Sequence, residues 1–153
     1  MSDASATVRG DGTLQVVMLR IGSETFALDA GMVREIIDPI PATRVAGARS
    51  HLDRIVNVRG NVVPLADIRE RFGMKPAATT PDTRFVVIEV EIDGDPVVVA
   101  LVADKVFEVR EIDFGNQQPV PKVGAPWKPE YIKGIVKCDD EFVIMPDIKK
   151  TLI

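Results

Sequence analysis

The sequence has few of the residues on which most catalytic and metal sites depend. Of its 153 residues only Cys138 is a cysteine, which excludes an internal disulfide and a cysteine zinc site. Its single histidine is His51, and a transition-metal site normally needs several such ligands. The chain also has no P-loop, dinucleotide-binding glycine pattern or nucleophile elbow. These absences argue against an enzyme and predict a binding module without metal or cofactor.

Long apolar segments and an excess of positive charge are missing as well. The longest apolar run, at 97–103, is far too short to cross a bilayer. Residues 1–7 have neither a basic start nor an apolar centre, so we expect no signal peptide. The formal net charge is −4, whereas nonspecific nucleic-acid binding relies on clustered Lys and Arg. We therefore expect a cytoplasmic protein without direct membrane contact and without a nucleic-acid partner.

What the sequence does contain is an internal repeat. The pattern Ala-Leu-x-Ala-x-x-Val-x-Glu, followed by Ile or Val, occurs at 27–36 and again at 100–109. A second set of matches, Ile-Val, then Val, then Asp-Ile, occurs at 55–68 and again at 135–148. Ordered matches of this kind indicate a duplicated small β unit, with a seam between two lobes. Seams between lobes are common positions for binding sites.

The apolar pattern predicts about five short strands and little helix in each half. Strand-like runs open the two halves at 14–21 and 85–92. Five such strands close most economically as a small barrel. Each half alone would bury only a modest core, so we expect the halves to share apolar surface. We thus predict an all-β domain over 14–153, preceded by a disordered tail at 1–13. Its parts are a first lobe at about 14–73, a connector at about 74–84 and a second lobe at about 85–153, with a short helix after the last strand of each lobe.

Four segments of the chain resemble the signature of a known family. Asn57-Val58-Arg59-Gly60, followed by Val62-Val63-Pro64-Leu65-x-Asp67-Ile68-Arg69, resembles the N-L-R-G turn and I-V-P-x-x-D-L-R segment of CheW-type chemotaxis coupling proteins. The segment at 33–36 is similar to that family's V-x-E-I, and 102–109 is similar to its V-V-D-x-V-x-E-V. The resemblance spans residues 14–152. The chain departs from the family pattern at Arg54, where a glycine is usual, and at Val58 and Ala103.

The resemblance implies two packed SH3-like five-stranded barrels and a non-catalytic adaptor. In this family the module bridges the cytoplasmic tips of chemoreceptors and the CheA histidine kinase, whose regulatory end contains the same module. The expected partners are therefore the regulatory domain of a CheA-type kinase and the tip of a methyl-accepting chemoreceptor. The protein would be recruited from the cytoplasm to membrane-associated receptor arrays.

The resemblance also implies a set of receptor-binding residues. A receptor tip is a helical hairpin, so we expect it to dock in an apolar groove. Arg59 and Glu35 match family positions implicated in receptor coupling, and we expect these two side chains to lie near each other. From the residues alone, the segment 57–60 is equally a stable turn in which Gly60 supplies a positive φ. The candidate receptor-binding residues are Val33, Glu35, Ile36, Asn57, Val58, Arg59, Gly60 and Val106.

For the kinase, the family uses one contact on the first lobe and another at the far end of the second lobe. The hairpin around 26–28 and the residue Met32 are candidates for the first contact. Apolar residues of the Pro-rich loop are candidates for the second, because they have no evident core role. The alternative is that this loop packs back onto its own barrel. The candidate kinase-binding residues are Phe26, Leu28, Met32, Val120, Val123 and Trp127.

A second class of function is open to a small β-barrel, namely binding of a small ligand or of single-stranded nucleic acid. Barrels of this size bind single strands through aromatic platforms and a basic groove. The chain has six Phe but one Tyr and one Trp, and its net charge is negative. The composition therefore favours the adaptor over this alternative.

Overall fold

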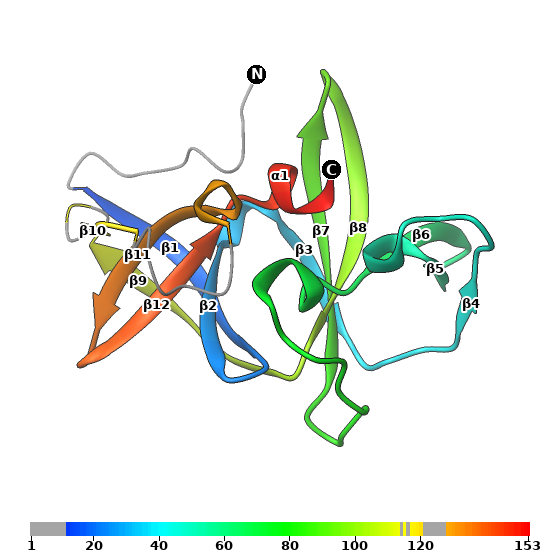
Figure 1. The fold of residues 1–153 in the computed structure, drawn as a ribbon, viewed down its shortest axis with the longest axis horizontal. Coiled ribbons are helices and arrows are strands. Elements are labelled where there is room, and N and C mark those ends of the chain that lie inside the picture. The colour runs from blue at the N-terminus through cyan, green and yellow to red at the C-terminus, as the bar shows by residue number, and fades with distance from the viewer. Residues whose placement is uncertain (1–11, 114, 116, 121–127) are drawn as a thin grey trace.

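The computed structural model describes residues 12–113, 115, 117–120 and 128–153 (Figure 1). Within these ranges the chain is built mainly of strands, which confirms the all-β class expected from the sequence. The strands are β1 (Thr13–Ile21), β2 (Glu24–Asp29), β3 (Val33–Ile37), β4 (Ala42–Arg44), β5 (Arg54–Val58), β6 (Asn61–Ala66), β7 (Arg84–Ile92), β8 (Asp95–Ala103), β9 (Lys105–Asp113), β10 (Gln117–Gln118), β11 (Ile132–Cys138) and β12 (Glu141–Pro146). The helical elements are the 3-10 turns η2 (Ala30–Met32), η3 (Ser50–Leu52), η4 (Glu70–Phe72) and η6 (Pro129–Tyr131), and the α-helix α1 (Ile148–Leu152).

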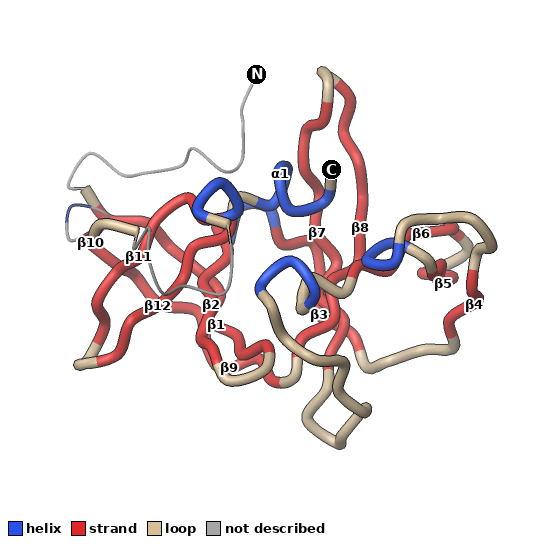
Figure 2. The backbone as a smooth tube through the Cα atoms, viewed as in Figure 1, coloured by secondary structure: helices blue, strands red, loops and turns tan. Residues whose placement is uncertain are grey.

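The strands form two six-stranded sheets (Figure 2). The first sheet has the order β10-β11-β12-β2-β1-β9, and the second has the order β3-β7-β8-β6-β5-β4. Each sheet contains five longer strands and one short strand, which is β10 in the first and β4 in the second. Prolines lie next to both short strands, and for this reason the sequence pattern predicts loops there.

Short helical elements follow the last strand of each half, but they differ in type. After β12 the chain forms α1, where Asp147 Oδ1 accepts a hydrogen bond from the Lys150 N–H at 3.1 Å. After β6 it forms only the 3-10 turn η4, which ends at Gly73 with a φ of 70°. The expected helix at this position is thus reduced to a single turn.

Each sheet takes strands from both halves of the chain, which corrects the expected division into sequential lobes. Hairpin β1–β2 lies in the first sheet with β9 to β12, and hairpin β7–β8 lies in the second sheet with β3 to β6. The two halves have therefore exchanged their first hairpins, so the boundaries at about 14–73 and 85–153 do not separate the sheets. A local apolar pattern predicts that a segment is a strand, but it does not say with which distant strand it pairs.

The pairing registers agree with the repeat in the sequence. When β1 to β6 are matched in order with β7 to β12, the two sheets have the same strand order. A register shift interrupts β1–β9 between Met18 and Leu19, and another interrupts β3–β7 between Val33 and Glu35. Each sheet also contains one parallel pair, β12–β2 in the first and β6–β8 in the second. The molecule therefore has an approximate internal two-fold relation between its sheets.

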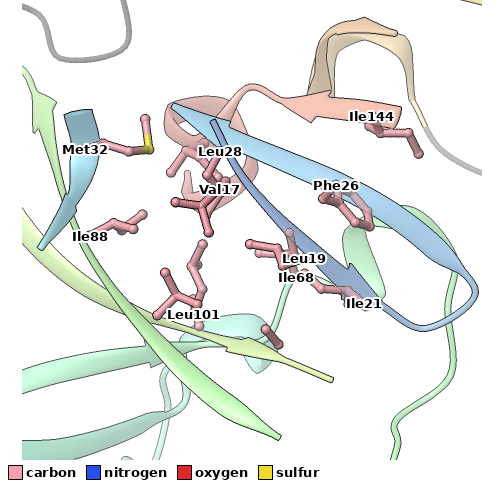
Figure 3. Packing of buried hydrophobic residues seen from close by; sticks show 14 of the residues in the cluster. Val17, Leu19, Ile21, Phe26, Leu28, Met32, Ile68, Ile88, Leu101 and Ile144 are labelled. Atoms are coloured by element: carbon pink, nitrogen blue, oxygen red, sulfur yellow. The ribbon is translucent and has the colours of Figure 1, made fainter. Parts of the chain in front are cut away.

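Three apolar clusters hold this arrangement together. One cluster lies within the first sheet, with Leu14, Val16, Met18, Ala27, Ile112, Val136, Val143 and Met145. A second lies within the second sheet, with Val56, Val58, Val63, Leu65, Phe85, Val87, Ala100 and Val102. The third, which we call the shared core, contains residues of both sheets and includes Val17, Leu19, Phe26, Leu28, Ile88 and Leu101 (Figure 3).

The shared core explains why the strands of the first hairpin of each half are apolar almost without interruption. In β1, Val16 and Met18 face the first sheet's own cluster, whereas Val17 and Leu19 face the shared core. Full burial of such a side chain stabilises the fold by about 1.5–3 kcal/mol. Separating the sheets would expose the whole shared core, so the expectation that the halves share apolar surface is confirmed.

Candidate functional site

The segment 57–60 contains the last two residues of β5 and the tight turn that connects β5 to β6. Val58 pairs with Asn61, which leaves Arg59 and Gly60 as the two turn residues. Arg59 has a φ of 52° and Gly60 has a φ of 87°, as a two-residue turn of type I′ requires. The Gly60 N–H donates a hydrogen bond of 2.8 Å to Asn57 Oδ1. Asn57 and Gly60 therefore stabilise the conformation of the turn, whereas the side chain of Arg59 is not needed for it and extends from the surface.

Arg59 pairs with Glu35 on β3, which confirms the expected proximity of these two residues. Arg59 Nε donates to Glu35 Oε1 at 3.2 Å and to Oε2 at 3.1 Å. The Arg59 side chain is 77% exposed, so this pair adds little to stability, about 0–1 kcal/mol. Within the described part of the chain, the two terminal nitrogens of Arg59 have no hydrogen-bond acceptor, so they can meet a carboxylate of a partner.

A second charge pair lies beside the first. Arg34 donates a hydrogen bond to Glu89 Oε1 on β7. Arg34 and Glu35 are neighbours in β3, yet both line the same surface, because the register shift between Val33 and Glu35 interrupts the regular alternation of the strand. The bulge thus places two charged side chains of β3 on one side of the second sheet.

Between these charges the second sheet has an open groove with a volume of about 620 Å³. Its apolar lining includes Val62, which is 72% exposed, and Val98, which is 38% exposed. Its lining residues are Arg34, Glu35, Val58, Arg59, Asn61, Val62, Val63, Val87, Glu89, Pro96, Val97 and Val98. All of them belong to strands of the second sheet or to the β5–β6 turn. The groove therefore lies on one sheet and not at the seam between lobes.

The structure brings together three of the candidate receptor-binding residues in this groove, namely Glu35, Val58 and Arg59. Asn57 lies on β5 and Gly60 lies in the β5–β6 turn, both next to the groove lining, and Ile36 is 42% exposed on β3 without lining the groove. Val33 and Val106 do not line this groove, and their part in receptor binding stays a prediction. Both are half-buried and pack against the shared core, and Val106 lies on β9 of the first sheet.

The pairing of β7 and β8 with the first-half strands explains what the sequence reasoning missed. Arg34, Glu89, Val62 and Val98 all line the groove, but β3 and β6 are distant in sequence from the hairpin β7–β8. One sequence signal was present, because Val62 and Val63 are adjacent in a predicted strand, where neighbouring side chains point to opposite faces. An apolar residue at an exposed strand position is a weak indication of a contact surface.

The kinase-binding candidates of the first half are core residues. Phe26, Leu28 and Met32 are 0%, 2% and 6% exposed, and all three belong to the shared core (Figure 3). Their interpretation as surface contacts is wrong. Phe26 and Leu28 lie on β2, an internal strand between β12 and β1, and Met32 lies on η2 directly after it, so all three side chains pack in the shared core. Val120 is half-buried and packs against the shared core, as the alternative for the Pro-rich loop predicts. Val123 and Trp127 lie outside the described residues.

The remaining reactive side chains serve the fold. His51 is buried, and its Nε2 lies 3.0 Å from the backbone oxygen of Leu152. Burial raises the pKa of the Cys138 thiol, which favours the unreactive protonated form. Among the described residues, no group of three His, Cys, Asp or Glu side chains could hold a metal ion. The described part of the chain also has no helix with the length and apolarity needed to cross a membrane.

Comparisons with known proteins agree with the motifs and the fold. The CheW-like domain family matches residues 15–152. A probable chemotaxis protein CheW of Rhizobium etli is 28% identical over 138 residues, which cover 90% of this chain and 86% of the relative. The chemotaxis protein CheW of Helicobacter pylori is 31% identical over 109 residues, which cover 71% of this chain and 64% of the relative.

A solved structure shows the same fold. The crystal structure of the scaffolding protein TtCheW from Thermoanaerobacter tengcongensis matches with a TM-score of 0.78 and 28% sequence identity. The match covers 92% of this chain and 88% of that chain. This chain therefore belongs to the CheW-like family of chemotaxis scaffolding proteins, a family that is generally non-catalytic.

Proposed function

We propose that this protein couples the cytoplasmic tips of methyl-accepting chemoreceptors to a CheA-type histidine kinase, and that the receptor tip docks in the groove of the second sheet. The observation that carries the proposal is the pairing of Arg59 with Glu35 at the edge of this groove. Both residues belong to the segments that resemble the family signature. The protein would thereby join membrane-associated arrays through its partners.

The groove suits a helical partner for two physical reasons. First, Val62 and Val98 are exposed in the free protein, so covering them removes apolar surface from water. Second, two ion pairs line the groove beside these valines, so their charges can orient a partner. An apolar stripe on a helix can thus insert while Arg59 meets a carboxylate next to that stripe.

The kinase must then bind outside the groove, so that both partners can be held together. We propose the segment that contains Val123 and Trp127 for this contact. The candidates Phe26, Leu28 and Met32 are not part of this proposal, because their side chains are buried.

Replacing Arg59 by asparagine tests the receptor contact. Asparagine tolerates the left-handed conformation that the turn requires, so the variant should fold normally. Without the guanidinium, we expect the affinity for a receptor cytoplasmic fragment from the same cell to fall about tenfold, which corresponds to about 1.4 kcal/mol. Isothermal titration calorimetry measures this change directly.

Arg44→Asn is a matched control. Arg44 is as exposed as Arg59, at 79%, and lies on β4 outside the groove lining, with Asp53 3.9 Å away. The control should bind the receptor fragment as wild type does, and both variants should keep their affinity for the kinase regulatory domain. Equal receptor affinity of Arg59→Asn and wild type would contradict the proposed site.

A further inference from the structure

Hairpin β7–β8 is longer than its repeat equivalent β1–β2. The repeated Ala-Leu pair falls at Ala27 in β2 and at Ala100 in β8. β2 begins at Glu24, close to this pair, whereas β8 begins earlier, at Asp95. Each strand of β7–β8 therefore extends further toward its turn, and the hairpin projects from the body of the molecule (Figure 1). The extension is specific to the hairpin that forms one wall of the groove.

The extension continues the groove wall outward. Glu89 pairs with Val98, and Glu91 pairs with Pro96. Because side chains alternate along a strand, Val87, Glu89 and Glu91 lie on one face of β7. Val87 and Glu89 line the groove, so Glu91 lies on the same face, one step closer to the turn. A partner long enough to pass Glu89 therefore meets Glu91 next.

The charges at this outer end are not compensated. Inside the groove, Arg59 pairs with Glu35 and Arg34 pairs with Glu89, so the lining is close to neutral. Glu91, Asp93 and Asp95 are exposed and have no ion-pair partner in the described part of the chain. Glu91 lies on the groove face and Asp93 lies in the turn, whereas Asp95 pairs with Ile92 and lies on the opposite face of the hairpin. Glu91 and Asp93 are therefore the charges that a helix leaving the groove past the turn would meet.

We infer that the β7–β8 hairpin selects helical partners that carry Lys or Arg next to their apolar anchors, at the end that faces the hairpin turn. An acidic residue at this position of the partner would be repelled, so the hairpin discriminates as well as attracts. The inference rests on the proposed function of the groove and adds the charge of the partner surface to it. Complementary charge of this kind contributes mainly to specificity and to the rate of association.

The test neutralises the three carboxylates without changing their shape. The hairpin variant carries Glu91→Gln, Asp93→Asn and Asp95→Asn, and asparagine tolerates the φ of 53° at position 93. The control variant carries Asp139→Asn, Asp140→Asn and Glu141→Gln at the β11–β12 turn. The β11–β12 turn belongs to the other sheet and also contains residues with positive φ values. The control substitutions change the net charge of the protein by the same amount as those of the hairpin variant.

The probe is the cytoplasmic fragment of a methyl-accepting chemoreceptor from the same cell, titrated against each full-length variant at low and at high salt. We expect the hairpin variant to bind about tenfold more weakly than wild type at low salt, with the difference closing at high salt. The control variant should bind as wild type does. Thermal unfolding of each variant, followed by circular dichroism, verifies that the proteins are folded.

Two results for the hairpin variant alone would overturn the inference while leaving the proposed function intact. One is equal affinity of the hairpin variant and wild type at low salt, and the other is tighter binding of the variant, which would indicate an acidic partner surface. If wild type itself fails to bind the receptor fragment, the proposed function fails and this inference fails with it. Equal weakening of both variants would show a general effect of net charge and would also contradict it.

Discussion

Arg69 joins the two sheets through a buried charge network, and we expect its replacement to destabilise the protein strongly. The residue follows β6 of the second sheet. Its guanidinium donates to Asp67 Oδ2 at 2.8 Å and to Asp104 Oδ1. Asp104 also accepts a hydrogen bond of 2.6 Å from the Gly22 N–H in the β1–β2 turn of the first sheet. Arg69, after β6, is thus connected through Asp104 to the β1–β2 turn of the other sheet.

The expected magnitude follows from burial. The Arg69 side chain is 4% exposed, and those of Asp67 and Asp104 are 26% and 18% exposed. Removing one partner of a buried charge pair costs about 3–5 kcal/mol, because the other charge stays buried and unpaired. Because the two carboxylates keep some contact with water, we expect Arg69→Met to lower the free energy of unfolding by about 3 kcal/mol, the lower end of this range. For a chain of this size, that loss lowers the melting temperature by about 6–12 °C.

Urea denaturation followed by circular dichroism measures this loss. Methionine keeps most of the apolar stem of the side chain, so the change isolates the charge and its hydrogen bonds. Arg59→Met is the matched control, since Arg59 is 77% exposed in an ion pair and should cost about 0–1 kcal/mol. A loss no larger for Arg69→Met than for this control would refute the reasoning. A double-mutant cycle with Asp104→Asn should in addition show a coupling of about 1 kcal/mol or more.

Two further predictions concern the turn at Gly60 and the thiol of Cys138. Gly60 has a φ of 87°, and a Cβ at this position would meet no atom within 4 Å, so Gly60→Ala should cost about 1 kcal/mol of stability through the backbone alone. Gly94→Ala, at a φ of 86°, should cost the same. Urea denaturation measures both losses, and stabilisation by either change would contradict this account. Burial raises the pKa of Cys138, so the stability that this group contributes is present below the ordinary thiol pKa and is lost as the pH rises through the folded value. Iodoacetamide should therefore label the native protein more slowly than the urea-unfolded chain at mildly alkaline pH, and equal rates would show that the thiol is not protected.

Local chemistry was sufficient to predict the longer strands and the tight turns. The Arg59-Gly60 turn depends on neighbouring residues, since Gly60 supplies the positive φ and Asn57 accepts its N–H. The repeat added long-range information, because two copies of one pattern must fold in similar ways. The proximity of Arg59 and Glu35 came from the family resemblance, which adds knowledge of contacts that a single sequence does not contain.

Phe26, Leu28 and Met32 show where local reasoning failed. Their apolar character is compatible both with an exposed contact and with a core position. The insertion of β2 between β12 and β1 places Phe26 and Leu28 in the core, and η2, which follows β2, places Met32 there. Val106 shows the same limit, because its repeat equivalence to Val33 predicts its environment but not the sheet in which it lies.

The sequence by itself determined the longer strands, the tight turns, the repeat and the membership of a scaffolding family. The tertiary structure decided the exchange of the two first hairpins, the position of the groove on one sheet, and the acidic hairpin that forms its wall. The physical reason is the range of the interactions. Turn conformations and strand periodicity depend on neighbours in the chain, whereas a pairing such as β6 with β8 depends on burying apolar faces of segments that are far apart in sequence.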